Sequence, residues 1–192
     1  MTNATATSAR SGPTTAETNE DKFLTFRLGR EEYGVEILRV REIIGLIDIT
    51  PLPHTPDYVR GVINLRGKII PVIELRTKFG LAPVAYTEAT CVIVVEVEDG
   101  ENAEQLQMGV IVDTVSEVMD IRRDLIEPAP RFGTGAGAES ILGMGKVESG
   151  DTTKVVILLD IDRVLSGADS KSIQPDAETP VPCQDPDSRP AA

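Results

Sequence analysis

Two blocks of this sequence recur in the same order, which limits the chain to folds that can be built from two copies of one unit. Block 34–43 returns at 109–118, and block 61–79 returns in a degraded form at 143–165. The matched positions are Gly34 with Gly109, Val35 with Val110, Val40 with Val115, Glu42 with Glu117, Lys68 with Lys154 and Glu74 with Asp160. A duplicated unit has an internal seam between its copies, and such a seam is a natural place for a binding groove.

The two ends of the chain differ in composition from its middle. Residues 1–20 contain no large apolar residue beyond Met1, and residues 167–192 are rich in proline and have almost no apolar anchors. Segments of this composition bury too little surface to offset the entropy of the chain. We therefore expect disordered tails at 1–20 and 167–192 on either side of one domain at 21–166.

Removal of both tails should leave the stability of the domain unchanged. A chain without residues 1–18 and 170–192 should melt close to the full chain, because segments that do not pack on the core contribute little to its stability. Thermal melts of the two forms check this. A fall in Tm of about ten degrees would be large for a domain of this size and would show that a tail packs on the core.

Charge and cysteine content exclude several classes of protein. The chain carries a net charge of −12 with a sequence pI near 4.5, which argues against nucleic-acid binding and against adhesion to anionic lipid. No apolar stretch is long enough to cross a bilayer, and we expect no membrane insertion and no signal peptide. Cys91 falls in an apolar run and Cys183 in a tail, so no structural disulfide is expected, as in a reducing cytosol. With one histidine and no cysteine pair, we expect no metal and no cofactor.

Short runs of strand-forming residues separated by turn residues dominate the middle of the chain. Strands are predicted at 23–28, 33–37, 58–65, 68–75, 90–98, 107–112, 141–147 and 153–159. Apolar residues at helical spacing predict short helices at 38–44 and 114–119, and single helical turns are expected at 76–79 and 161–165. Many short strands with strong turn signals predict a mainly β fold of small barrels rather than a parallel sheet.

Arg66 is the strongest local signal, because it stands at the tip of an otherwise apolar hairpin and precedes Gly67. It has two interpretations: a solvated turn arginine, or one partner of an ion pair. Glu42 lies on the polar side of the first predicted helix, just before this hairpin. A Glu42–Arg66 pair would fix that segment to the barrel through a charge-assisted hydrogen bond.

No arrangement of residues indicates catalysis. Gly133–Gly137 resembles a phosphate-binding loop only loosely, because it lacks the Lys-Ser/Thr ending. Asp160 and Asp162 could share a face and bind a metal, or they could cap and solvate the last helical turn, which is the more ordinary role. No nucleophile with a neighbouring base is apparent. A small phosphatase or a nucleotide-dependent regulator is therefore the disfavoured alternative.

Several stretches resemble the CheW family of bacterial chemotaxis coupling proteins. They are Leu28–Ile43, Pro56–Phe79, Asp113–Val118, Pro128–Pro130 and Ile141–Gly145, and together they cover nearly the whole of the expected domain. The resemblance implies two five-stranded, SH3-like β-barrel subdomains that share a core. It also implies a non-enzymatic, cytoplasmic adaptor that couples the tips of membrane-bound chemoreceptors to the histidine kinase CheA. The same adaptor role in another chemosensory pathway, such as twitching motility, is the nearer alternative.

The resemblance also implies site residues. The receptor-binding positions are Ile37, Val40, Glu42, Ile43, Arg66, Cys91, Gly109, Val115 and Val118. For the apolar members, ordinary core packing is the alternative. Contacts with the regulatory domain of CheA map to the segment 127–132, and in it to Glu127 and Phe132. Glu127 departs from the basic residue that some members carry at its position.

Overall fold

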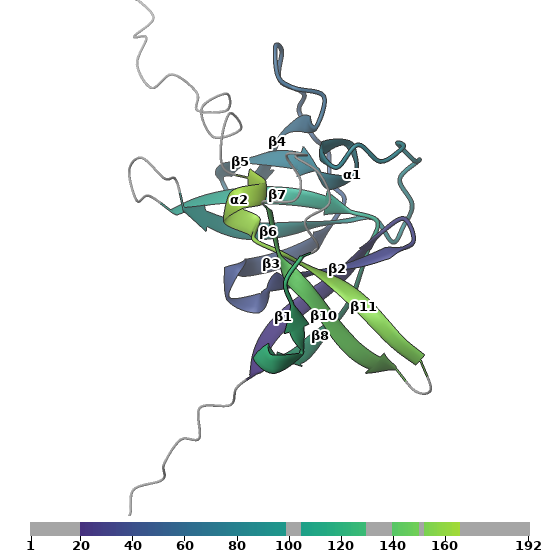
Figure 1. Ribbon diagram of the computed structural model, residues 1–192. Coiled ribbons are helices and arrows are strands. Elements are labelled where there is room, and N and C mark those ends of the chain that lie inside the picture. Colours follow the sequence, from purple (N-terminus) through teal and green to yellow (C-terminus); the bar gives the residue numbers. More distant parts are fainter. Residues whose placement is uncertain (1–19, 99–104, 130–139, 150–151, 166–192) are drawn as a thin grey trace, which may run out of the picture.

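The computed structural model describes residues 20–98, 105–129, 140–149 and 152–165, and strands make up most of them (Figure 1). The strands are β1 (Glu20–Leu28), β2 (Glu31–Glu36), β3 (Val40–Gly45), β4 (Val59–Leu65), β5 (Lys68–Glu74), β6 (Cys91–Glu98), β7 (Gln105–Val112), β8 (Thr114–Arg122), β9 (Ile126–Glu127), β10 (Ile141–Ser149) and β11 (Thr152–Leu159). The helices are short: α1 (Leu75–Lys78), α2 (Ile161–Leu165) and the 3-10 turns η1 (Ile37–Arg39) and η2 (Arg123–Leu125). Within the described part of the chain, none of them has the length and apolarity that a bilayer crossing requires.

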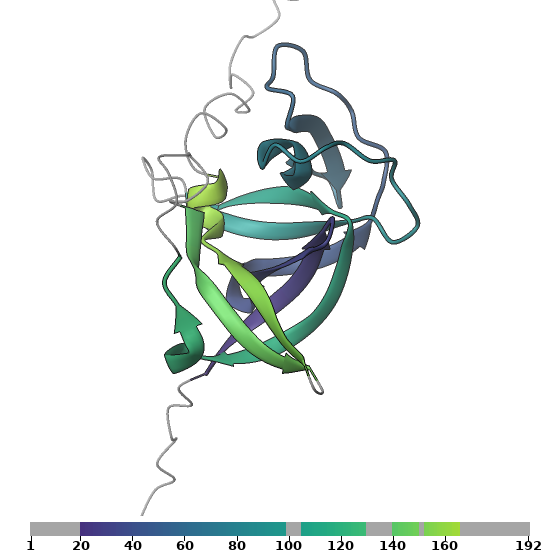
Figure 2. The same cartoon turned by 45° about the vertical axis from the view of Figure 1, so that its right-hand side comes forward.

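The strands form two sheets. Sheet A has the order β8-β1-β2-β11-β10-β9, and sheet B has the order β3-β6-β7-β5-β4. The expected five strands per subdomain are thus present, and sheet A gains only the two-residue strand β9. Figures 1 and 2 show both sheets strongly twisted, with α1 and α2 at the same end of the molecule. The mainly β fold with two sheets of five to six strands and short helices is confirmed.

The two copies of the repeat exchange strands between the sheets. The first copy spans β1 to β5 and the second β6 to β11. Sheet A joins β1 and β2 of the first copy to β8, β10 and β11 of the second, whereas sheet B joins β6 and β7 of the second copy to β3, β4 and β5 of the first. Equivalent residues of the two copies also have equivalent partners across the parallel strand pairs. Gly34 lies opposite Leu158 in β2–β11, and Gly109 lies opposite Val72 in β7–β5. Neither copy completes a sheet by itself.

The repeated glycines mark the place where side chains pack directly over the backbone of a central strand. A Cβ atom on Gly34 would lie 2.9 Å from Leu158 Cδ2, and one on Gly109 would lie 2.8 Å from Val92 Cγ1. Both distances are shorter than carbon atoms tolerate in a packed interior. The glycine is therefore required by packing at the equivalent place in each sheet.

Three apolar clusters form the core. The central cluster takes residues from both sheets, including Phe26 and Val35 of sheet A and Ile93 and Val110 of sheet B. Each sheet also covers a smaller cluster with its other face. The smaller clusters are Ile63, Ile70, Val72, Val92, Val94 and Ile111 in sheet B, and Phe23, Ile121, Val156 and Leu158 in sheet A. The shared core implied by the resemblance is this central cluster.

The two predicted short helices at 38–44 and 114–119 are wrong. Residues 38 and 39 belong to the 3-10 turn η1 and the rest of the first segment to β3, whereas the second segment lies wholly within β8. In β3, a bulge separates Val40 from Glu42, so Arg41 is an extra residue in the ladder. The bulge brings Val40 and Ile43, three residues apart, to the same face of the strand. The same irregularity recurs in β8 between Val115 and Val118. The spacing of three between apolar residues, which predicted a helix, is therefore produced by a bulged strand.

The two outer strands of sheet B approach each other. Thr50, which follows β3, and Val62 in β4 form an isolated bridge in which each backbone nitrogen donates to the other's carbonyl oxygen at 2.9 Å. The bridge passes directly over Gly61, whose φ is +136°. A Cβ atom there would lie 2.0 Å from the Thr50 carbonyl oxygen, so only glycine fits.

The predicted strands and the helical turns at 76–79 and 161–165 are present within three residues of their expected bounds. Residues 1–19 of the first expected tail, the whole second tail at 167–192 and the glycine-rich loop at 133–137 lie outside the described residues, whereas Glu20 begins β1.

Candidate functional site

The predicted apolar receptor positions fall on the two edge strands that the bulges shape. Ile43 in β3 and Val118 in β8 occupy equivalent positions of the two copies, and their side chains are 45% and 50% exposed. Val40 and Val115, also equivalent, are partly buried and pack against the central core. We call these four residues the edge-strand surface. Its two inner members hold the strands to the core, and its two outer members present apolar groups to solvent.

Cys91 connects the two strands of the edge-strand surface. It begins β6, where it pairs with Gly45 of β3, and its thiol makes a hydrogen bond with the backbone of Val115 at the start of β8. Burial raises the pKa of the Cys91 thiol above its usual value, and the bond to Val115 only partly opposes this rise. The Cys91 thiol is therefore neutral and half-buried, and it lies where the two sheets meet.

Ile37 and Gly109 lie apart from the exposed members of the surface. Ile37 is in η1 and packs, half-buried, against the central core. Gly109 is buried in the middle of sheet B, between Val94 and Val72. Its place in the structure is one of close packing beneath the surface rather than of direct exposure.

Glu42 and Arg66 form the expected pair, but on the surface of the protein. Arg66 Nη2 donates to Glu42 Oε2 at 2.8 Å, and the Arg66 and Glu42 side chains are 80% and 26% exposed. Arg66 and Gly67 have φ values of +52° and +86°, which is the geometry of the two-residue turn that favours Asn-Gly. Asn64 Oδ1 stabilises the turn by accepting a hydrogen bond from the Gly67 nitrogen at 2.9 Å. Arg66 thus combines both interpretations, a solvated turn residue and an ion-pair partner.

The pair faces away from Ile43, because neighbouring residues of a strand point to opposite faces. Glu42 lies opposite Val94 of the sheet B cluster, whereas Ile43 lies opposite Ile93 of the central core. The receptor-binding residues implied by the resemblance therefore occupy both faces of β3. A partner that contacts both groups must reach around this strand.

The expected kinase contact is described only in part. Glu127 is exposed in β9, where its Oε1 lies 2.7 Å from Lys146 Nζ of β10. The acidic residue at this position is therefore neutralised locally by a lysine from the neighbouring strand. Phe132 lies outside the described residues.

The acidic residues considered for a metal bind protein groups instead. Asp160 caps α2, because its Oδ1 accepts a hydrogen bond from the Arg163 nitrogen at 3.1 Å, and this is the expected capping role. Asp162 accepts from the Glu98 nitrogen at 2.9 Å and pairs with Arg39 at 2.7 Å. Within the described ranges, no three histidine, cysteine, aspartate or glutamate side chains come together to hold a metal ion.

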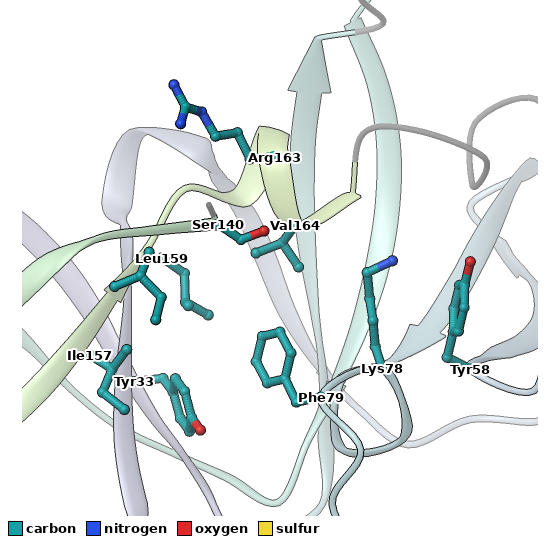
Figure 3. Close-up of a pocket in the computed structure, with 10 residues that line it drawn as sticks. Tyr33, Tyr58, Lys78, Phe79, Ser140, Ile157, Leu159, Arg163 and Val164 are labelled. Atoms are coloured by element: carbon teal, nitrogen blue, oxygen red, sulfur yellow. The ribbon is translucent and has the colours of Figure 1, made fainter. Parts of the chain in front are cut away.

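Sequence analysis missed a hollow of about 500 Å³ near α1 and α2, which we call the seam pocket (Figure 3). It is lined by Tyr33, Tyr58, Lys78, Phe79, Ser140, Ile141, Ile157, Leu159, Arg163 and Val164. Burial, and to a lesser degree the charge of Glu31, raises the pKa of Tyr33 above its usual value. The repeat contained the signal: extending the matched blocks aligns Tyr58 with Ser140 and Lys78 with Val164, so large residues in one copy face smaller ones in the other.

Comparisons with known proteins agree with this architecture. A protein-family model described as "CheW-like domain" matches residues 22–169. "Chemotaxis protein CheW" of Klebsiella aerogenes is 42% identical over 150 residues, which cover 78% of this chain and 84% of that protein. "Protein FrzA" of Myxococcus xanthus is 29% identical over 154 residues, or 80% of this chain and 91% of that protein.

A solved structure extends the similarity to three dimensions. The scaffolding protein TtCheW from Thermoanaerobacter tengcongensis matches with a TM-score of 0.68 and 31% sequence identity, over 83% of this chain and 96% of that one. Its fold, the family match and the relatives agree over the part of the chain that holds both sheets. The chain belongs to the CheW-like domain family.

Proposed function

We propose that this protein is a non-catalytic chemotaxis adaptor that couples the cytoplasmic tips of chemoreceptors to the histidine kinase CheA. The observation that carries the proposal is the edge-strand surface: in a member of this family, Ile43 and Val118 expose apolar groups at equivalent positions of two exchanged sheets. An exposed apolar patch on a rigid sheet favours contact with another protein. The protein would act in the cytoplasm, at membrane-bound receptor arrays.

The receptor side of this proposal uses the edge-strand surface together with Cys91 and the Glu42–Arg66 pair. Ile37 and Gly109 would support the surface from within. The kinase side uses the region of Glu127, whose pairing with Lys146 leaves little net charge for the partner to match. Coupling would depend on the relative placement of the two partners. A scaffold alters kinase activity only if it binds the active and inactive states of the kinase with different affinities.

A receptor-binding assay tests the edge-strand surface. Ile43→Glu and Val118→Glu should each weaken co-sedimentation with receptor-containing membranes at least tenfold, because a carboxylate in an apolar contact costs several kcal/mol unless it finds a partner. Val155→Glu is the matched control, since Val155 in β11 is also 50% exposed but lies outside the surface. If the control weakens binding as much as the test variants, the edge-strand surface is not the receptor contact.

A double-mutant cycle tests the Glu42–Arg66 pair. Arg66→Asn keeps a residue suited to the turn, and Glu42→Gln keeps the shape of the side chain. Their coupling energy for unfolding should be below about 1 kcal/mol, because the pair is largely exposed to solvent. For receptor binding, we expect strongly non-additive effects. Additive effects on binding would show that the two residues act separately.

The second candidate is the same adaptor role in another chemosensory pathway, and the observation that supports it is the similarity to Protein FrzA, a relative with a different name from the chemotaxis relatives. In that case the protein would serve as the same kind of adaptor in a non-flagellar system, such as twitching motility. Purification of the protein from its native cells with its bound receptors and kinase distinguishes the two pathways.

A further inference from the structure

Leu38 is the most exposed large apolar residue in the described part of the chain, with an exposed fraction of 87%. It occupies the middle of η1, between Ile37, which packs against the central core, and Arg39. Single exposed leucines are ordinary on protein surfaces, so exposure alone assigns no role to Leu38. The contacts of its neighbours and its counterpart in the second copy carry the inference.

The turn η1 is held in place on both sides of Leu38. Ile37 is anchored in the core, and Arg39 Nη2 lies 2.7 Å from Asp162 Oδ2 of α2. Arg39 Nη1 also lies 3.3 Å from Glu98 Oε1, and Asp162 Oδ1 accepts a hydrogen bond from the Glu98 nitrogen at 2.9 Å. The turn is therefore tied to both β6 and α2. A side chain that stands on such a turn binds a partner without the cost of ordering its backbone.

The repeat shows that the fold does not need an apolar residue at this place. The counterpart of Leu38 is Asp113, and the counterpart of Asp162 is Arg76. At the junction before β8, Asp113 makes the ion pair with Arg76 of α1 at 2.6 Å. At the junction before β3, the equivalent link to Asp162 of α2 has the opposite polarity and comes from Arg39, one residue further along the chain. Leu38 is thus free of the contact that its counterpart makes.

The arginines next to Leu38 already have partners within the chain. Arg39 has the two carboxylate partners described above, and Arg41 pairs with Glu96 of β6. A protein that covers Leu38 therefore meets no uncompensated charge on these arginines. The surface that fits this turn is an apolar groove, with polar groups only at its rim.

We propose that Leu38 contacts the chemoreceptor and enters an apolar groove of its cytoplasmic tip. This inference rests on the proposed function, and it extends the receptor contact from the edge-strand surface to η1. Continuity supports this occupant, because Val40, an inner member of that surface, follows Leu38 by two residues. Ile37, the receptor position that the resemblance implies in this turn, packs against the core. Leu38 therefore supplies the side chain that the turn presents to the receptor.

Co-sedimentation of the full-length chain with receptor-containing membranes, in the absence of kinase, tests the proposal. Leu38→Asp should weaken binding at least about fivefold, because a carboxylate placed in an apolar contact is costly. Leu38→Met keeps an apolar side chain of similar volume and should bind as the unmodified protein does. Leu125→Asp is the matched control, since Leu125 is an exposed leucine of the other 3-10 turn, η2. Leu38→Asp should leave the Tm unchanged, because the side chain lies outside the core.

Ile43→Glu in the same assay separates failure of this inference from failure of the proposed function. If Ile43→Glu weakens binding and Leu38→Asp does not, or if Leu125→Asp weakens binding as much as Leu38→Asp, Leu38 is not a receptor contact and the adaptor function still stands. If the unmodified protein does not co-sediment with the membranes, both are overturned. Binding to purified CheA is measured in parallel. If Leu38→Asp loses this binding and keeps the receptor, the occupant is the kinase and the assignment to the receptor is wrong.

Discussion

Replacement of Gly61 by alanine should destabilise the protein by about 3–5 kcal/mol and lower its Tm by roughly ten degrees or more. The added Cβ would lie 2.0 Å from the carbonyl oxygen of Thr50, and the backbone atoms of Thr50 cannot move without breaking its two hydrogen bonds to Val62. The φ of +136° adds conformational strain for any residue with a side chain. Chemical denaturation and thermal melts measure the loss.

Gly80→Ala is the matched control for this prediction. Gly80 ends α1 with a φ of +70°, but no atom of the described residues lies within 4 Å of the position that its Cβ would occupy. Only the cost of the left-handed backbone remains there, about 1–2 kcal/mol. If Gly61→Ala melts like Gly80→Ala, the contact between Thr50 and β4 is not the constraint that we infer.

Removal of the Asp113 carboxylate should have the second-largest effect, a loss of about 3 kcal/mol of folding free energy. Asp113 Oδ2 accepts hydrogen bonds from Arg76 Nη1 at 2.6 Å and from the Gly29 nitrogen at 2.7 Å. Arg76 is buried, and its Nε and Nη2 atoms donate to the carbonyl oxygen of Ala82. Asp113→Ala would leave a buried guanidinium without this counter-charge and would break the link to the turn after β1.

Two further variants separate the cause from a general loss of packing. Asp120→Ala removes a carboxylate from the exposed pair with Lys22 and should cost less than about 1 kcal/mol. The double variant Arg76→Leu, Asp113→Ala should be more stable than Asp113→Ala alone, because it removes the unpaired charge. Equilibrium unfolding of the four proteins measures these differences, and a double variant less stable than the single one would contradict this account.

Local sequence patterns were sufficient to predict most strands. Apolar and polar residues alternate in β1, and β6 is a short continuous apolar run, and both patterns are typical of strands rather than of helices. They failed at 38–44 and 114–119, since a bulge at Arg41 or Ser116 changes the spacing of apolar residues from two to three. A bulge is a property of the pairing between strands. The sequence of the bulged segment does not show that, at the bulge, two of its residues lie opposite a single residue of the partner strand.

The candidate site was predictable to a different extent. The proximity of Glu42 and Arg66 followed from their order along the chain, but their exposure depends on how far the outer strands of sheet B approach each other. The link between Asp113 and Arg76 joins residues with no recognisable motif. The sequence also did not show that strands of one copy pair with strands of the other. Two matching blocks have the same sequence whether or not their strands are exchanged.

The exchange of strands has a consequence for how this protein is made. The first hairpin, β1–β2, finds its neighbours only in β8 and β11, and the ion pair between Asp21 and Arg123 spans 102 residues of sequence. A ribosome adds roughly 5–20 residues per second, so this hairpin waits for seconds with both edges unpaired. Such long-range pairing slows folding. During synthesis, the unpaired edges of this hairpin can therefore pair with strands of other chains. This stage ends only when the last strand, β11, has been made.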